Sequence, residues 1–511
     1  MLRNMSAMLY PVGTGKSRVV VIGAGIGGLT AGALLARRGY SVLIVDQAIV
    51  PGGCASTFKR KGFTFDVGAT QVAGLEPGGI HHRIFSELEI DLPAATPCDP
   101  ACAVYLPGEK TPINVWRDPD KWDEERCQQF PGSKPFWQLI STLFQASWNF
   151  QGRDPVLPPR NVWDLWQLTK AVRSDTLITV PYSLFTVGDA LRAYKLAHDN
   201  RLRTFLDLQL KLYSQVSAEE TALLYAATAL SVSQLPHGLF HLQGSMQVLS
   251  DRLVSALERD GGKLLMRHAV EHIHVEQGKA TAVVIRNTKT GEVWTESADH
   301  VVANVTVQNL VQLLGEKAPI GYKQRVEKLP PATGAFVVYL GVDESAIPLG
   351  CPPHLQFMYN PNGPVGENNS LFVSVSHPGD GRAPAGKATI IASSFVDPQQ
   401  WWNTENYQGL KQKYTLEAIA HLAEFFYLKP ETIIHVEAAT PRTFAHYTAR
   451  DQGIVGGIGQ RIPTFGPFGF ANRTPINHLW LVGDSTHPGE GTAGVSYSAL
   501  TVVRQIEAGK F

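Results

Sequence analysis

The feature that most constrains the fold is an uncharged stretch at residues 19–36, in which four β-branched residues precede glycines and small apolar residues. Its length alone suits a membrane-spanning helix. The order of residues favours another interpretation: a buried strand at 19–22, a glycine turn, a helix up to Arg37, and a second strand at 41–45 that ends at Asp46. This order predicts a dinucleotide-binding βαβ unit, which a membrane helix does not explain.

The glycine turn has the spacing that phosphate binding requires. Gly23, Gly25 and Gly28 fit the pattern G-x-G-x-x-G. The first glycine permits a tight turn, the second lets the backbone approach a pyrophosphate, and the third lets the helix pack closely on the sheet. The helix N-terminus then offers partial positive charge to the phosphates. Asp46 is placed to accept hydrogen bonds from a ribose.

A second glycine-rich segment near the C-terminus suits a cofactor that carries a flavin. A β-rich run at residues 479–482 ends at Gly483 and Asp484, and three more glycines precede a helix-like stretch at 496–506. A second loop-to-helix junction directed at the same site suits a ribityl chain and a ring. We expect Asp484 to bind a ribityl hydroxyl and the helix start to offset negative charge on the reduced ring.

These segments together resemble the FAD-dependent amine oxidase superfamily, and within it the carotenoid desaturase and isomerase family of the phytoene desaturase type. The similarity lies in residues 50–70, in a middle block at 244–304, and in Thr-His-Pro-Gly-Glu-Gly at 486–491. The resemblance implies that Val270 touches the adenine side of FAD through its backbone. One departure is Cys54, because many relatives carry arginine after the Gly-Gly pair; one phosphate or flavin contact therefore differs.

The resemblance implies FAD as the cofactor and no metal ion, and it assigns no catalytic residue. We expect FAD to be bound by two glycine-rich turns, by the loops between them and by the start of the last helix. These residues are Gly23, Ala24, Gly25, Ile26, Gly27, Gly28, Asp46, Gly52, Gly53, Gly68, Ala69, Thr70, Val270, Gly483, Asp484, Gly491, Gly494 and Val495.

The expected fold class is α/β, with a Rossmann-like FAD-binding domain and an inserted α+β substrate domain. We expect residues 15–90, 236–320 and 450–511 to form the discontinuous FAD-binding domain, and residues 91–235 and 321–449 to form the substrate-binding domain. Apolar residues at helical spacing predict helices at 136–150, 162–172, 218–230 and 407–426. Short β-branched runs predict strands at 335–342, 370–375 and 389–396.

Six of the ten tryptophans fall between residues 116 and 166, and an apolar run follows at 177–185. Tryptophan suits a membrane interface, because its ring is apolar and its N–H is polar. Lys170 and Arg173 would meet anionic lipid headgroups. Two interpretations stay open: a face that docks on a membrane, or the aromatic core of the helical part.

Charge and cysteine content exclude several classes of protein. The 45 basic residues balance the 45 acidic residues, which argues against a nucleic-acid-binding face. Five scattered cysteines are not a disulfide framework and indicate a reducing compartment. The first sixteen residues are too weakly apolar for a signal peptide. The P-loop-like stretch at residues 13–17 lacks the first glycine of that motif, because position 10 is tyrosine.

The resemblance implies a peripheral membrane enzyme on the cytoplasmic side that desaturates an acyclic or monocyclic carotenoid by hydride transfer to flavin. The motif at residues 483–491 is most similar to C-3',4' desaturases of photosynthetic bacteria. A quinone or oxygen would accept the electrons. Three alternatives stay open: a carotene cis–trans isomerase that uses reduced FAD, a flavin oxidase of amines or porphyrinogens, and a flavin-free lipid carrier similar to the escorts of prenylated GTPases.

Overall fold

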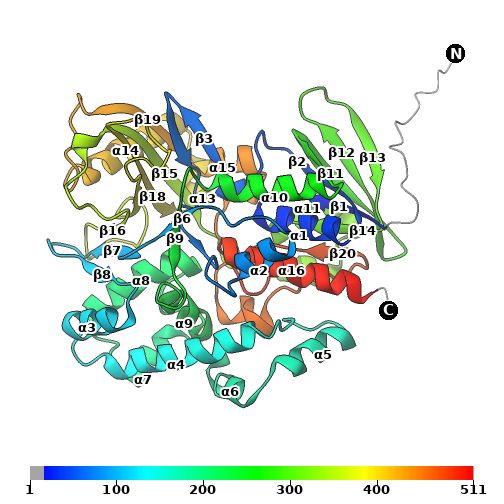
Figure 1. Ribbon diagram of the computed structural model, residues 1–511, viewed down its shortest axis with the longest axis horizontal. Helices are drawn as coiled ribbons and strands as arrows, with labels where there is room; N and C mark the ends of the chain where they lie inside the picture. The colour runs from blue at the N-terminus through cyan, green and yellow to red at the C-terminus, as the bar shows by residue number, and fades with distance from the viewer. Residues whose placement is uncertain (1–16, 510–511) are drawn as a thin grey trace.

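The computed structural model describes residues 17–509, and its centre is a five-stranded parallel sheet (Figure 1). The P-loop-like stretch and the segment considered as a signal peptide lie outside the described residues, apart from Ser17. Strands from three distant parts of the chain pair in this sheet, so the nucleotide-binding unit is not contiguous in sequence. In spatial order they are β10 (Lys263–Met266), β2 (Ser41–Asp46), β1 (Arg18–Ile22), β14 (His300–Ala303) and β20 (Leu479–Leu481).

Helix α1 (Ile26–Arg37) follows β1 and packs between two helices from later in the chain. These are α10 (Gln247–Arg259) and α16 (Thr492–Ala508), and α2 (Ile80–Glu87) also contacts α16. Leu29, Leu34 and Leu35 of α1 are completely buried, although they lie on different faces of the helix. The apolar sequence at 19–36 is therefore explained by burial inside a globular core, and none of the helices within residues 17–509 is long and apolar enough to cross a membrane.

The opposite face of the parallel sheet carries a small antiparallel sheet and two helices. Ile273 and Val283 of this small sheet pack with Val301 and Leu310 in one buried cluster. The elements are β11 (His268–Glu276), β12 (Lys279–Asn287), β13 (Val293–Ser297), α11 (Val307–Leu314) and α12 (Ile320–Glu327).

A second, seven-stranded sheet lies beside the nucleotide-binding unit (Figure 1). Alternate residues of its central strand β15 face opposite ways: Phe336 and Val338 pack with Tyr414 of α14 (Tyr407–Leu422), and Val337 packs with Phe63. The order of strands is β19 (Ile433–Ala439), β15 (Gly334–Asp343), β18 (Lys387–Val396), β17 (Ser370–Val375), β16 (His354–Met358), β7 (Cys102–Tyr105) and β8 (Ile113–Val115). Strands β7 and β8 belong to residues 91–235, the first insert, which is otherwise mainly helical. The sequence patterns did not predict these two strands. Residues 321–449 are the second insert.

The first insert supplies a layer of helices below both sheets in Figure 1. Its helices are α3 (Pro119–Gln129), α4 (Lys134–Gln151), α5 (Val162–Ala171), α6 (Ser174–Leu177), α7 (Val187–Ala193), α8 (Asn200–Ser214) and α9 (Leu223–Ser231), with a 3₁₀ turn, η2, at Val180–Leu184. The helix expected at residues 218–230 begins only at Leu223, because residues 217–221 form a turn in which Thr221 N–H donates to Ser217 O at 3.0 Å.

The tryptophans of this insert divide between the two expected roles. Trp122 and Trp137 are buried in the core of the insert, with ring centroids 6.0 Å apart. Trp116, Trp148 and Trp163 are half-buried. Trp166 of α5 is exposed. The aromatic-core interpretation therefore holds for the first pair, and docking on a membrane stays a prediction, which only the exposed Trp166 among these six tryptophans fits.

Short strands and helices connect these layers. Two β-ribbons, β3 (Thr57–Arg60) with β4 (Phe63–Asp66), and β9 (Leu239–Leu242) between β5 (Val72–Ala73) and β6 (Ala95–Pro97), lie between the two larger sheets. Helices α13 (Pro398–Asn403) and α15 (Pro441–Thr448) flank the sheet that contains β15.

Candidate cofactor and substrate site

The glycine turn after β1 is held tightly against its surroundings. Gly23 has a φ of +95°, which favours glycine, and its N–H donates to Val45 O at 2.8 Å. A Cβ on Gly28 would lie 2.0 Å from Gly23 O, so this position also requires glycine. A Cβ on Gly25 would lie 2.8 Å from Asn304 Nδ2. The turn therefore keeps its backbone close to β14 and leaves open space at the start of α1.

Asp46 at the end of β2 binds backbone groups on both sides of it. Its carboxylate accepts from Ala24 N–H and from Ala48 N–H, each at 2.7 Å. Burial raises the pKa of Asp46, and the two backbone hydrogen bonds oppose that rise. Asp46 thus stabilises the glycine turn directly, a role that the motif alone did not reveal. Its expected bond to a ribose remains a prediction.

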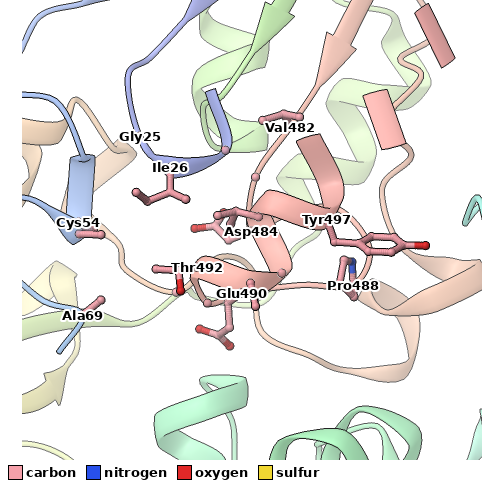
Figure 2. A pocket seen from close by; sticks show the side chains of 18 of the residues that line it. Gly25, Ile26, Cys54, Ala69, Val482, Asp484, Pro488, Glu490, Thr492 and Tyr497 are labelled. Atoms are coloured by element: carbon pink, nitrogen blue, oxygen red, sulfur yellow. The ribbon is translucent and has the colours of Figure 1, made fainter. Parts of the chain in front are cut away.

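The C-terminal loop reaches the same place from the other end of the chain. Gly483 follows β20 with a φ of +123°, and its N–H donates to Ser498 Oγ of α16 at 3.2 Å. A Cβ on Gly494 would lie 2.5 Å from Gly489 O, so the start of α16 packs closely on its own loop. Figure 2 shows Gly25 and Ile26 on one side of the pocket and Val482, Asp484 and Thr492 on the other.

One cavity of about 1150 Å³ joins almost all the residues that the sequence assigned to the cofactor. Ala24 and Gly28 are the exceptions: both are buried and lie outside the cavity lining, where Ala24 binds Asp46 and Gly28 packs on Gly23. Lining the cavity are Gly23, Gly25, Ile26, Gly27, Asp46, Gly52, Gly53, Gly68, Ala69, Thr70, Val270, Gly483, Asp484, Gly491, Gly494 and Val495.

Two helix N-termini at this cavity lack a capping side chain. Gly25 precedes α1 and Gly491 precedes α16, and neither helix has an acidic residue in its first turn. The first N–H groups of a helix have no partner within the helix, and they attract anions. The structure therefore provides donors for a pyrophosphate at α1 and for a negatively charged ring at α16. These are the two anionic parts of a reduced flavin dinucleotide, so the residues present fit FAD.

A buried polar cluster lies next to the C-terminal loop. Arg450 and Asp484 form an ion pair of 2.8 Å, with only 17% and 14% of their side chains exposed. Glu490 lies in the same cluster and was not assigned a role from the sequence. In the sequence, Glu490 could have been noticed only as a charged residue among the glycines of the 486–491 motif. Arg450 lies in no motif and could not have been found in this way.

The histidine of that motif is neutral. Burial lowers the pKa of His487 to about 4. Its Nε2 lies 2.9 Å from Gln151 Oε1 at the end of α4. His487 therefore holds the flavin-side loop against the helical insert.

The cavity continues away from this cluster between apolar walls of the second sheet and the helical insert. These walls include Trp148, Leu168, Val172, Val180, Leu224, Val232, Val337, Phe372, Phe395 and Phe465. An apolar wall offers no hydrogen bonds and excludes water, so the arrangement suits a hydrocarbon held beside a redox cofactor.

Comparison with known proteins finds similarity along almost the whole chain. Residues 21–88 match the NAD(P)-binding Rossmann-like domain. Prolycopene isomerase 2 of an Oncidium hybrid cultivar is 28% identical over 508 residues, covering 96% of this chain and 83% of that protein. The zeta-carotene-forming phytoene desaturase of Myxococcus xanthus is 26% identical over 505 residues, covering 96% and 93%. The chain is thus similar along almost its whole length to proteins named as carotenoid desaturases and isomerases.

The comparisons confirm the predicted α/β fold class, and they agree with the predicted family, the predicted FAD-dependent oxidoreductase and FAD as its cofactor. The solved structure of cyclohexylamine oxidase from Brevibacterium oxydans has the same fold, with a TM-score of 0.61 over 96% of this chain and all of that chain, at 16% identity.

Proposed function

We propose that the protein is an FAD-dependent carotenoid desaturase that introduces a double bond near the end of an acyclic or monocyclic carotenoid, of the C-3',4' type. The observation that carries this proposal is the single cavity that contains both the glycine-lined cofactor groove and an apolar passage. Curated relatives that align along almost the whole chain are named as carotenoid desaturases and isomerases, which supports a carotenoid as the substrate.

The side chains of the cavity bind and orient the substrate and exclude water, because the cofactor supplies the chemistry. Bound FAD would accept a hydride from the substrate. Val337, Phe372 and Phe395 of the second sheet form one wall, and residues of α4, α5 and α9 form the other. A long apolar molecule enclosed by these walls has few orientations, so one end of it is presented to the cofactor.

Isomerisation is the second candidate, and a specific observation favours it. Glu490 is a half-buried residue whose carboxyl group lines the cavity, and burial of that group raises its pKa well above the usual range. A protonated acid beside a polyene can act without net oxidation. Prolycopene isomerases at 25–28% identity are among the relatives, which supports the same candidate.

The mass of the product separates these functions. Purified protein loaded with FAD is supplied with acyclic carotenoids, in both all-trans and cis forms, together with a quinone. A product lighter by two hydrogens supports desaturation, and the position of the new bond tests the C-3',4' assignment. An unchanged mass with altered geometry supports isomerisation. Conversion of amines or porphyrinogens with peroxide release, and of no carotenoid, would contradict both.

We further propose that the protein docks on a membrane through the surface around α5, α6 and η2. Eight apolar residues are exposed there: Val162, Leu165, Trp166, Leu177, Ile178, Val180, Leu184 and Phe185. Exposed cations flank them at Arg160, Lys170 and Arg173, and Lys170 Nζ lies 5.3 Å from the ring centroid of Trp166. A soluble protein rarely exposes so many apolar side chains together without a partner.

The position of the cavity favours a lipid surface as that partner. Leu168 of α5, Val172 just after α5 and Val180 of η2 line the cavity, so the exposed apolar surface adjoins the substrate passage. A carotenoid dissolved in lipid would enter here without crossing water. We propose peripheral attachment to the cytoplasmic side of a membrane, with a quinone or oxygen as the electron acceptor.

A further inference from the structure

Glu490 occupies an unusual place in the cavity. It comes directly before Gly491, the residue that precedes α16, and its side chain points away from the loop into the open space of Figure 2. Its Oε2 accepts a hydrogen bond from Gln215 Nε2 at 2.9 Å. Its Oε1 has no hydrogen-bond partner among the described residues. A buried polar atom without a partner is costly, so its persistence here indicates a ligand or a reaction.

The backbone around Glu490 keeps room for this carboxyl group. A Cβ on Gly456 would lie 2.3 Å from Glu490 Oε2, and Gly456 has a φ of +68°. Gln215, the residue that ends α8, has a φ of +65°. One non-glycine residue with a disfavoured backbone conformation, Gln215, and one glycine that leaves room therefore lie beside this carboxyl group, and such conformations cluster at functional sites.

The surroundings of Glu490 favour its neutral form. Burial raises the pKa most, and the nearby Asp484 raises it further. The hydrogen bond from Gln215, and the charges of Arg450 and Lys211, oppose the rise without cancelling it. Tyr225 of α9, which also faces Glu490, donates its own hydroxyl proton to Tyr213 O. These surroundings therefore favour the protonated carboxyl group of Glu490 over the carboxylate.

Other titratable groups near this part of the cavity are less suited to exchange a proton with a substrate. His487 is neutral, and its Nε2 is engaged with Gln151. The hydroxyls of Tyr213, Tyr225 and Tyr497 have pKa values raised by burial, so they neither ionise nor act as acids near neutral pH. Asp484 is paired with Arg450.

We propose that Glu490 is the acid–base residue of the carotenoid reaction, exchanging a proton between its carboxyl group and a carbon of the bound polyene. This inference rests on the proposed function and names the residue that performs its proton transfer.

In isomerisation, the π electron pair of a C=C bond forms a C–H bond with the carboxyl proton, leaving a carboxylate and a delocalised cation. Rotation about the former double bond follows. The C–H pair then restores the double bond, and the proton returns to Glu490.

Desaturation would use the ionised form of the same carboxyl group, whose share grows as the pH rises. Glu490 would take a proton from one carbon, whose C–H electron pair becomes the new double bond, while bound FAD would accept the hydride lost by the neighbouring carbon. The two reactions thus predict opposite pH dependence. Isomerisation slows as pH rises through the raised pKa of Glu490, and desaturation accelerates.

The test is Glu490→Gln, which preserves the shape of the side chain and can still accept from Gln215. General acid–base catalysis contributes about 10²- to 10⁴-fold, so we expect kcat to fall by about that factor while KM and FAD content stay unchanged. Glu258→Gln, on the exposed side of α10, is the matched control and should retain the wild-type rate. An unchanged kcat in Glu490→Gln would overturn the inference.

A second variant covers the case in which Glu490→Gln does not fold. Glu490→Asp keeps the carboxyl group but shortens the side chain by one methylene. We expect partial activity, and we expect the limb of the pH–rate profile that reports this group to move to a different pH. A limb at the wild-type position with full activity would also overturn the inference. Wild-type protein that converts no carotenoid would instead refute the proposed function, which distinguishes the two failures.

Discussion

The exposed surface of α5 permits a quantitative test of membrane docking. The double variant Leu165→Ser/Trp166→Ser removes two side chains that are 51% and 57% exposed. Their exposure means that they contribute little to the core, so the variant should fold normally. Any loss of lipid binding would then report on the surface itself.

The expected loss of membrane-binding free energy follows from the apolar area that the two side chains expose. A tryptophan offers roughly 200 Å², of which the exposed 57% would contribute about 3 kcal/mol on complete transfer to an apolar medium. Half of a leucine adds about 1 kcal/mol. At the headgroup boundary we expect only about half of this apolar area to leave water. The variant should then lose about 2 kcal/mol of binding free energy, equivalent to roughly 30-fold weaker binding.

The assay is co-sedimentation with phosphatidylcholine vesicles, with and without an anionic lipid. Leu349→Ser is the matched control, because Leu349 is fully exposed on the side of the second sheet, away from α5. The control should bind as the wild type does. Added salt should weaken binding to the anionic vesicles, because Lys170 and Arg173 contribute by charge. Equal binding by the double variant and the wild type, or an equal loss in the control, would refute the reasoning.

Further predictions concern the cofactor site. Gly25→Val should abolish FAD binding, because the new side chain would meet Asn304 and fill the approach to the first turn of α1; full flavin absorbance in the purified variant would contradict this. Asp46→Ala should weaken FAD binding by about 1–3 kcal/mol, or roughly 5- to 150-fold in Kd, because the lost charged hydrogen bonds stabilise the glycine turn; titration of apoprotein with FAD measures it, and an unchanged Kd would count against Asp46. Acid should destabilise the protein in part through His487, whose pKa falls to about 4 on folding from 6.5. The unfolded chain then binds more protons between these values, so stability is lost as pH falls through this window. His487→Asn should flatten the dependence of the melting temperature on pH over the same range, and a slope equal to that of the wild type would exclude this cause.

Local patterns predicted the regular elements well. The strand at 370–375 was predicted at its observed bounds, and α4 and β18 lie within two residues of their predicted limits. These segments have clear periodicity because each buries one face or both. The βαβ unit was equally clear, because its glycines serve a backbone geometry that other residues do not permit.

Features that depend on distant contacts were not predictable in this way. β7 and β8 join the sheet of the second insert only because β16 supplies a partner edge, and strands of three or four residues carry no clear periodicity. The exposure of Trp166 and the burial of Trp137 depend on packing, since both lie in apolar sequence. The role of Asp46 in binding Ala24 and Ala48 was hidden behind its expected bond to ribose. Glu490 became a candidate only when the fold brought Gln215 and Arg450 to it.

The central sheet has a consequence for how this protein is made. β14 forms its edge at residues 300–303, and the strand that covers this edge, β20, is synthesised more than 170 residues later. During translation the nascent chain therefore presents an open edge of a parallel sheet, which is prone to aggregation. The order of the strands therefore means that the sheet, and the cofactor pocket that α16 borders, are completed only when the last residues of the chain have left the ribosome.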